Sequence, residues 1–141
     1  MASVSFHSYD IDFKIPNPRK ITSWIKHTIK QEKKSLYQLN FVFCSDDYVR
    51  LLNIQYLNHQ TFTDILTFNS SEIKNGPLEG DIFISVPRVT ENAFKLNVSF
   101  EEELRRVIIH GVLHLIGYLD KTPTQKKQMR KKEDSYLSLW K

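Results

Sequence analysis

Residues 110–120 read His110-Gly-Val-Leu-His114-Leu-Ile-Gly117-Tyr-Leu-Asp120. Two histidines four apart on a helix lie on one face, one turn apart, with about 5–6 Å between their Cβ atoms. Gly117 can end that helix, because glycine accepts the left-handed conformation that helix ends often need. Asp120 then returns to the same side as a third potential ligand, and such a set leaves one position of a tetrahedral zinc open, as in catalytic sites. We therefore predict one Zn²⁺ per chain, held by His110, His114 and Asp120 at a helix-to-loop junction.

The alternative is a buried helix that carries two core histidines. Apolar residues surround the pair nearly all round, namely Val107, Ile108, Ile109, Val112, Leu113, Leu115 and Ile116. A histidine pair at this spacing is, by itself, more often structural. The glycine stop and the carboxylate three residues later favour the metal site.

The composition is that of an ordinary globular protein. The chain has 141 residues, of which 40% are hydrophobic and 26% are charged, so it can bury one continuous core. No apolar run approaches the roughly 20 residues needed to span a bilayer, and the first residues lack the charged start and apolar stretch of a secretory signal. The single cysteine, Cys44, allows no internal disulfide and suggests a reducing compartment. We expect one domain, residues 1–141, in the cytoplasm and without a membrane partner.

Basic residues gather directly after the predicted ligands. The formal net charge is +4, and residues 121–133 hold one acid against Lys121, Lys126, Lys127, Arg130, Lys131 and Lys132. Such a run is most often a solvated helix face. Beside a hydrolytic metal, however, a cationic surface would attract a phosphate-rich substrate. We predict substrate contacts from Lys121, Lys126, Lys127 and Arg130.

Hydrophobic spacing and turn residues divide the chain into strands and helices. The expected strands cover residues 2–8, 36–44, 64–68 and 80–85. The expected helices run from about Arg19 to Lys33, from a cap at Ser45 or Asp46 through Tyr56, from Pro87 to about Leu96, from a cap at Ser99 through the histidines, and from about Pro123 to Leu139. Glu103 stands where a capping box or first-turn acid is expected. The order β-α-β-α-β-β-α-α-α predicts an α+β fold with a mixed, mainly four-stranded sheet and about five helices.

The spacing of the histidines invites comparison with the zinc-binding motif of metzincin proteases. Those enzymes carry a glutamate directly after the first histidine, and it acts as general base on the metal-bound water. Here that residue is Gly111, which has no side chain to take a proton. The sequence therefore argues against peptide hydrolysis.

The same motif resembles the signature of the YbeY endoribonucleases, which is similar to His-Gly-x-Leu-His-Leu-x-Gly-Tyr followed by an acid and a histidine. Residues 110–118 match that signature. Further blocks follow in the family's order: Leu52 and Asn53 with Tyr56, residues 63–68 (Thr-Asp-Ile-Leu-Thr-Phe), residues 80–82 (Gly-Asp-Ile), then Met129 and Glu133.

The resemblance implies a metal-dependent, zinc-using endoribonuclease that cleaves single-stranded RNA in ribosomal RNA maturation and ribosome quality control. It also implies ribosomal RNA and the small ribosomal subunit as partners, no DNA substrate, and a bacterial cytoplasmic location. The same resemblance implies an α+β fold with the metal at the helix-to-loop junction.

The chain departs from the family pattern at two positions. Asp120 stands where most members have a third histidine, and a carboxylate oxygen can replace that ligand at a similar distance. Leu57 stands where the family commonly has an arginine that serves the RNA reaction, and leucine cannot bind phosphate. We predict catalytic roles for His59 and Arg106, which could compensate, as could Asn58, Arg88 or Arg105. The plainer readings are a loop residue for His59 and a surface ion pair for Arg106.

Two other functions stay open at this point. One is a metallopeptidase-like hydrolase that uses the same ligands, against which Gly111 counts. The other is a ribosome-binding module whose metal only pins a helix to a loop, which Leu57 and the basic last helix keep possible. Asp64 and Asp81 match family blocks, and each either bonds nearby backbone amides or supports the metal from a second layer.

Overall fold

The computed structural model describes residues 2–57, 63–71, 73 and 76–141. Four strands form one mixed sheet in the order β1-β2-β4-β3, with the bounds β1 Ser3–Tyr9, β2 Leu36–Cys44, β3 Ile65–Asn69 and β4 Leu78–Ser85. The pairs β1/β2 and β2/β4 are parallel, and β3 runs antiparallel to β4 at the edge. The predicted mixed four-stranded sheet is confirmed.

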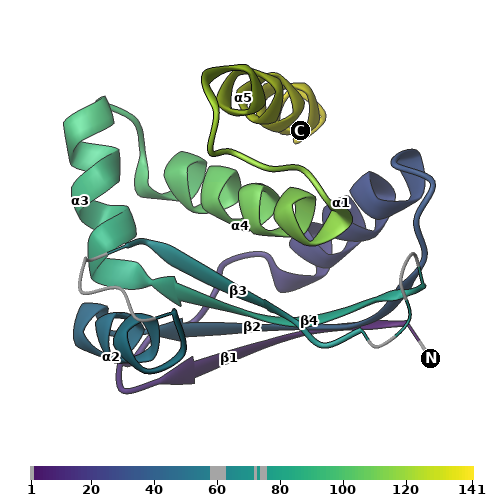
Figure 1. Cartoon of the computed structure of the whole chain (residues 1–141). Coiled ribbons are helices and arrows are strands. Elements are labelled where there is room, and N and C mark those ends of the chain that lie inside the picture. The colour runs from purple at the N-terminus through teal and green to yellow at the C-terminus, as the bar shows by residue number, and fades with distance from the viewer. Residues whose placement is uncertain (1, 58–62, 72, 74–75) are drawn as a thin grey trace.

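In the described part of the chain, five helices pack around this sheet, with the bounds α1 Pro18–Gln31, α2 Asp46–Leu57, α3 Val86–Leu96, α4 Phe100–Ile116 and α5 Pro123–Leu137. Figure 1 shows α1 and α4 on one side of the sheet, α2 on the other, and α5 stacked on α4 as an outer layer. The element order and the α+β class agree with the sequence prediction. No helix among the described residues is long and apolar enough to cross a bilayer.

The two faces of the sheet carry different side chains, as the alternation of a strand requires. Leu39, Phe41 and Phe43 of β2 are buried against α1 and α4 in the main core. On the opposite face a smaller cluster joins Cys44 and Leu66 to Val49 and Leu52 of α2. Because α4 packs on the sheet with one side and on α5 with the other (Figure 1), its sequence is apolar nearly all round.

A close approach of α4 to the sheet depends on Gly111. A Cβ atom at this position would lie 2.8 Å from Ile65 Cδ1 and 3.2 Å from Ile82 Cγ2. Glycine is therefore needed because β3 and β4 occupy the space that a side chain would fill. Position 111 faces the sheet, so a carboxylate there would point into the core.

The ends of α4 follow the predicted residues, with one correction. The Ser99 side chain accepts a hydrogen bond from the Glu102 backbone N–H at the start of the helix. Gly117, with φ of +130°, ends it by donating to the carbonyls of Leu113 and His114. Glu103 is an acid of the first turn, as one of its two expected roles requires, but the capping-box position falls on Glu102, and the Glu103 side chain is instead buried at 5% exposure.

Candidate metal centre

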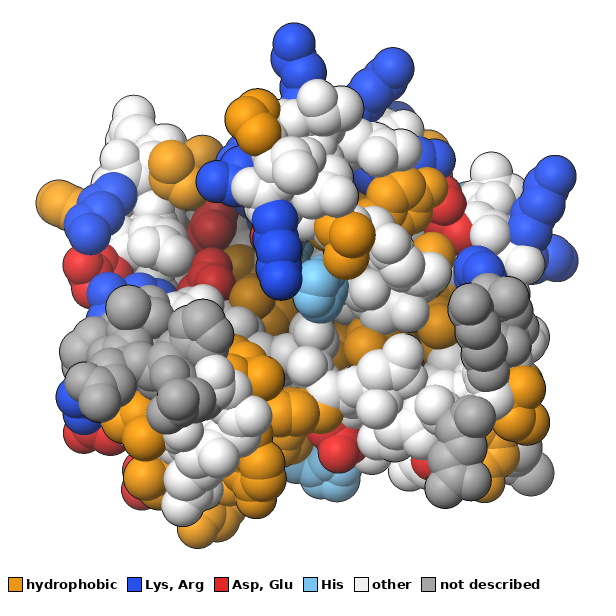
Figure 2. Space-filling view, viewed as in Figure 1, with side chains coloured by type: hydrophobic (Ala, Val, Ile, Leu, Met, Phe, Trp, Pro, Cys, Tyr) orange, Lys and Arg blue, Asp and Glu red, His pale blue; other side chains and the backbone are white. Residues whose placement is uncertain are grey.

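A cleft of about 770 Å³ opens between α4, α5 and β3. Figure 2 shows it as a hollow below α5, with lysine and arginine side chains above it and acidic and histidine side chains inside. The described residues that line it include both histidines of α4, the loop after that helix, and residues of β3 and α5. The ionisable members are Asp64, Glu103, Arg106, His110, His114, Asp120, Lys121, Lys126, Arg130 and Glu133.

His110 is oriented by a glutamate from α5. Its Nδ1 lies 2.7 Å from Glu133 Oε2, and because a carboxylate only accepts, the ring donates from Nδ1. Glu133 is 4% exposed, and Arg106 donates to its other oxygen at 3.0 Å. Burial alone would lower the pKa of His110, but the hydrogen bond and charge of Glu133 outweigh it and raise that pKa.

His114 is oriented by the loop that follows it. Its Nδ1 lies 3.1 Å from the backbone carbonyl oxygen of Tyr118, so this ring also donates from Nδ1. The His110 and His114 rings are nearly parallel, at 11°, with centroids 6.3 Å apart. With Nδ1 engaged in both rings, Nε2 is the nitrogen left to bind a metal, and metal-ligating histidines are commonly oriented in this way by a hydrogen bond from the other ring nitrogen.

Asp120 lies beside the first histidine. Its Oδ2 is 3.3 Å from His110 Nε2, and its side chain is 39% exposed. Among the described residues, no three His, Cys, Asp or Glu side chains already surround one point closely enough to hold an ion. Side chains must therefore move before His110, His114 and Asp120 share a metal. The donor types and the occupied Nδ1 atoms fit zinc, and the assignment stays a prediction.

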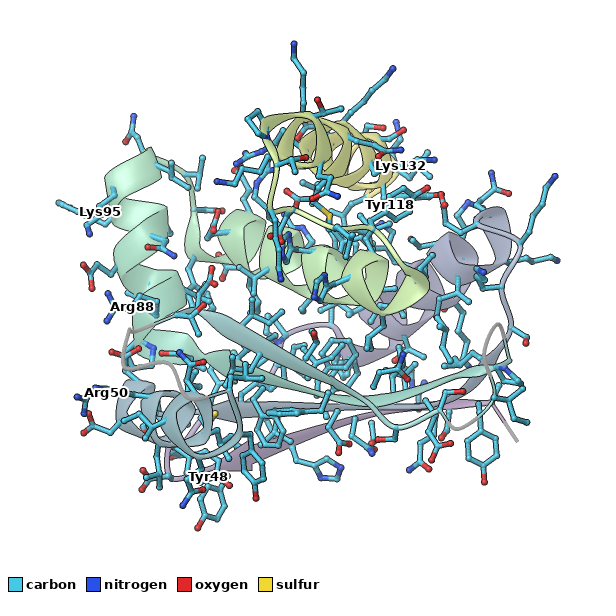
Figure 3. The ribbon with its side chains drawn as sticks, viewed as in Figure 1. Tyr48, Arg50, Arg88, Lys95, Tyr118 and Lys132 are labelled. Atoms are coloured by element: carbon cyan, nitrogen blue, oxygen red, sulfur yellow. The ribbon has the colours of Figure 1, made fainter. Side chains whose placement is uncertain are left out.

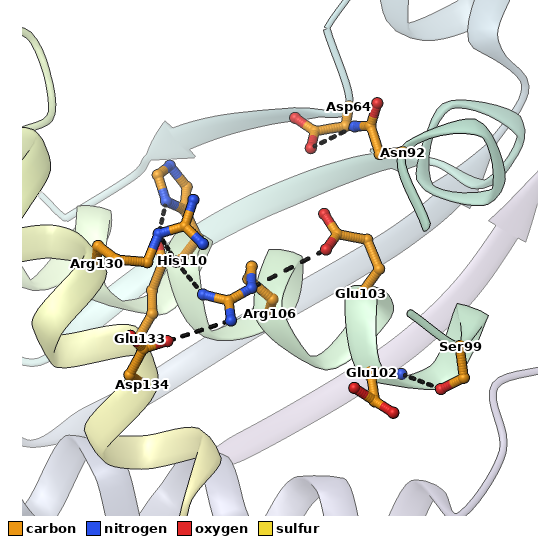
Figure 4. Close-up of polar contacts among 10 residues, drawn as sticks. All are labelled: Asp64, Asn92, Ser99, Glu102, Glu103, Arg106, His110, Arg130, Glu133 and Asp134. Atoms are coloured by element: carbon orange, nitrogen blue, oxygen red, sulfur yellow. Dashed lines mark hydrogen bonds and ion pairs between the residues drawn. The ribbon is translucent and has the colours of Figure 1, made fainter. Parts of the chain in front are cut away.

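Arg106 joins the acidic residues at the back of the cleft (Figure 4). It bonds Glu133 and Asp134 and lies 4.0 Å from Glu103 Oε1. The guanidinium of Arg106 is thus held in ion pairs, which was the alternative to a catalytic role, although Arg106 does line the cleft. Glu103 Oε1 has no hydrogen-bond partner among the described residues. Burial raises the pKa of Glu103 and of Asp64, despite the positive charges near each carboxyl.

The basic residues after the motif divide into two groups. Lys121, Lys126 and Arg130 line the cleft. Lys127 is not among the described residues that line it. Adjacent residues on a helix point about 100° apart, so Lys127 points in a different direction from Lys126. Its predicted contact with substrate in the cleft therefore lacks support. His59 lies outside the described residues.

The comparisons with known proteins agree over nearly the whole chain. A family model described as Endoribonuclease YbeY matches residues 5–141. Proteins named Endoribonuclease YbeY are 46% identical in Amoebophilus asiaticus, over 96% of this chain and 92% of the relative, and 48% identical in Karelsulcia muelleri, over 92% and 90%. The chain belongs to the YbeY endoribonuclease family. A solution structure of a protein from Thermotoga maritima is 27% identical, with a TM-score of 0.65. The match covers 96% of this chain and 87% of the Thermotoga chain.

Leu57, which stands where the YbeY family commonly has an arginine, lies at the cleft. Leu57 ends α2 and lines the cleft, so the missing arginine would have faced the same site. The described cations on this cleft come instead from α4, from the loop after it and from α5. Asp81, the other acid of the family blocks, accepts a hydrogen bond from Asn40 at 3.0 Å on the opposite face of the sheet. It does not support the metal site.

Sequence reasoning missed the role of Glu133 in this YbeY site. The family blocks match Glu133 on the last helix but give it no role. A signal was present: it is the single acid in a basic run, four residues after Met129, and both face the core at 4% and 2% exposure. An acid on the buried stripe of a helix needs a partner, and His110 and Arg106 are those partners.

Proposed function

We propose that this chain is a zinc-dependent endoribonuclease that cleaves single-stranded RNA in ribosomal RNA maturation and ribosome quality control. Its partners would be ribosomal RNA and the small ribosomal subunit, in the bacterial cytoplasm. Membership of the YbeY family supports the nuclease activity. The zinc and the ribosomal setting rest on the sequence motif and the resemblance.

One observation carries the proposal. The Nδ1 atoms of His110 and His114 are both engaged, by Glu133 at 2.7 Å and by the Tyr118 carbonyl at 3.1 Å, inside a cleft with basic walls. Structural histidines of a core also need partners for their ring nitrogens, but these two rings are half-buried and line an open cleft. The alternative of a purely structural histidine pair is therefore disfavoured.

His110, His114 and Asp120 would hold the zinc ion, which when bound supplies a Lewis acid and a water with a pKa near 7. Lys121, Lys126 and Arg130 would bind the phosphates on either side of the cut, since all three line the cleft. Glu133 keeps the proton of His110 on Nδ1 and compensates the positive charge of Arg106. The buried carboxyls of Asp64 and Glu103 disfavour phosphate at the back of the cleft.

A metallopeptidase-like hydrolase fits the structure less well. The position that carries the protease's glutamate is Gly111, and a side chain there would meet Ile65 and Ile82 of the sheet. The ribosome-binding module with a structural metal keeps one supporting observation, the leucine that replaces the family's arginine on the cleft wall.

RNA cleavage by matched variants tests the proposal. The His114→Ala variant removes a proposed ligand, whereas His27→Ala removes an exposed histidine of α1 as the control. We expect His114→Ala to lose at least about 100-fold in cleavage of a single-stranded RNA, since losing even a group behind a ligand costs about 10–100-fold. His27→Ala is expected to match the wild type. Equal cleavage by all three folded proteins would contradict the proposal and favour the binding module.

A further inference from the structure

Tyr118 is held by hydrogen bonds at its backbone carbonyl and at its side-chain hydroxyl. Its backbone carbonyl accepts the Nδ1–H of His114 at 3.1 Å, and its hydroxyl donates to Glu32 Oε1 at 2.6 Å, across 86 residues of sequence. The ring between these two bonds packs against the main core. One residue thus connects the second histidine of the motif to the C-terminal end of α1.

Glu32 is a buried junction of three elements. It is the C-cap residue of α1, and its side chain is 9% exposed. Besides Tyr118 of the loop, Lys132 of α5 donates to Oε2 at 3.1 Å, and the Tyr136 hydroxyl donates to the same oxygen. These donors together lower the pKa of Glu32 despite its burial. Figure 3 shows Tyr118 and Lys132 next to each other between α1 and α5.

The loop that delivers Asp120 is held at its two ends by backbone donors: the Tyr118 N–H donates to the Leu113 carbonyl, and the N–H groups of Lys121 and Thr122 donate to Gln125 Oε1. Gly117 and Leu119 are exposed, and Asp120 is half-buried. Gly117 takes a φ of +130°, a conformation that glycine adopts far more readily than other residues. Between those two ends, the Tyr118 side chain packs against the core, and its hydrogen bond to Glu32 fixes where that side chain lies.

We propose that Glu32 is a positioning residue for the metal centre. Acting through Tyr118, it fixes the His114 ring with Nε2 free and sets the path of the loop to Asp120. This inference rests on the proposed zinc site and extends it to a residue of α1 that has no contact with the ligands themselves. A buried charged acceptor suits this task, because hydrogen bonds to a charged group are about twice as strong as neutral ones.

The test compares Tyr118→Phe with Tyr136→Phe. Both variants remove one hydroxyl from the same carboxylate, but only Tyr118 reaches His114. Two quantities are measured: the zinc dissociation constant, by competition with a chelator, and the His114 tautomer in the metal-free protein, by long-range ¹H–¹⁵N NMR. We expect Tyr118→Phe to weaken zinc binding about 10-fold and to give a mixture of tautomers. Tyr136→Phe is expected to keep the wild-type affinity and the single Nδ1–H form.

A second pair of variants addresses Glu32 itself. Glu32→Ala is expected to reproduce the Tyr118→Phe effects, and Glu32→Gln, which retains an acceptor oxygen, to recover most of the affinity. In the double variant of Glu32→Ala and Tyr118→Phe the losses are expected not to add, since both act on one chain of contacts.

Two results would overturn the inference, and they are distinguishable. Normal zinc affinity and an unchanged tautomer in Tyr118→Phe would show that the junction serves stability alone, while the zinc site stands. A wild type that binds no zinc would remove the proposed function together with this positioning role.

Discussion

The contact between α4 and the sheet at Gly111 predicts the cost of adding a single methyl group. In Gly111→Ala the new Cβ would lie 2.8 Å from Ile65 Cδ1 and 3.2 Å from Ile82 Cγ2. The first distance is shorter than any ordinary carbon contact, so a neighbouring side chain must move. Ile65 is half-buried and Ile82 is fully buried, so Ile65 is the side chain that can give way.

Two opposing terms set the magnitude. Alanine is more favourable than glycine inside a helix by about 1 kcal/mol. Crowding a packed core costs about 1–3 kcal/mol. We expect Gly111→Ala to lose about 1 kcal/mol of unfolding free energy net, which lowers the melting temperature by about 3 °C in a domain of this size. Gly111→Val, with two further carbons in the same space, is expected to lose about 3 kcal/mol or more.

A double-mutant cycle separates crowding from helix propensity. Ile65→Val removes the Cδ1 atom that the new Cβ would meet, and by itself it costs about 0.5–1.5 kcal/mol. In the Gly111→Ala background that cost is expected to fall by at least about 0.5 kcal/mol. Chemical denaturation of the four proteins provides the free energies of unfolding. The reasoning is refuted if Gly111→Ala is stabilised by the full helix-propensity gain and the two changes are additive.

Three further predictions concern buried ionisable groups. Because burial raises the pKa of Glu103, the wild-type protein loses stability as the pH rises through the pKa of Glu103 in the folded state. Glu103→Gln is therefore expected to be more stable than the wild type at pH 7 but not at pH 4. Denaturation at both pH values checks this, and an equal difference in unfolding free energy at the two would contradict it. Burial raises the pKa of the Cys44 thiol to about 12, so a thiol reagent at pH 8 is expected to react only as fast as the chain unfolds, and rapid native-state labelling would argue otherwise. Glu133→Gln removes the charge that faces His110 and is expected to weaken zinc binding about 10–100-fold. The control is Asp134→Asn, because Asp134, like Glu133, is a partner of Arg106. Equal zinc affinities in the two variants would rule out the role given to Glu133.

The sequence predicts most of the elements because their signals are local. The helix of the motif is an example: Ser99 starts it, Gly117 ends it, and both residues act within one turn of their own position. The alternation of Leu39, Phe41 and Phe43 likewise identifies the buried face of β2. Such patterns depend on the periods of helix and strand alone.

The arrangement of those elements depends on distant contacts that local patterns do not contain. Alternation identifies β1 as a strand, but it says nothing of its parallel pairing with β2. The same holds for the site: the histidines can be found from their spacing, whereas Glu133 reaches His110 only because α5 packs on α4. Glu32 could not be assigned at all, since its partners lie 86 to 104 residues away.

The zinc stoichiometry and affinity of purified Asp120→Ala, beside the wild type and His114→Ala, test the central claim most directly. The account predicts one zinc per wild-type chain, a clear loss of affinity in Asp120→Ala, and little or no bound zinc in His114→Ala. Zinc retained by Asp120→Ala at wild-type stoichiometry and affinity would contradict the assignment of Asp120 as the third ligand. Retention by both variants would contradict the metal centre itself.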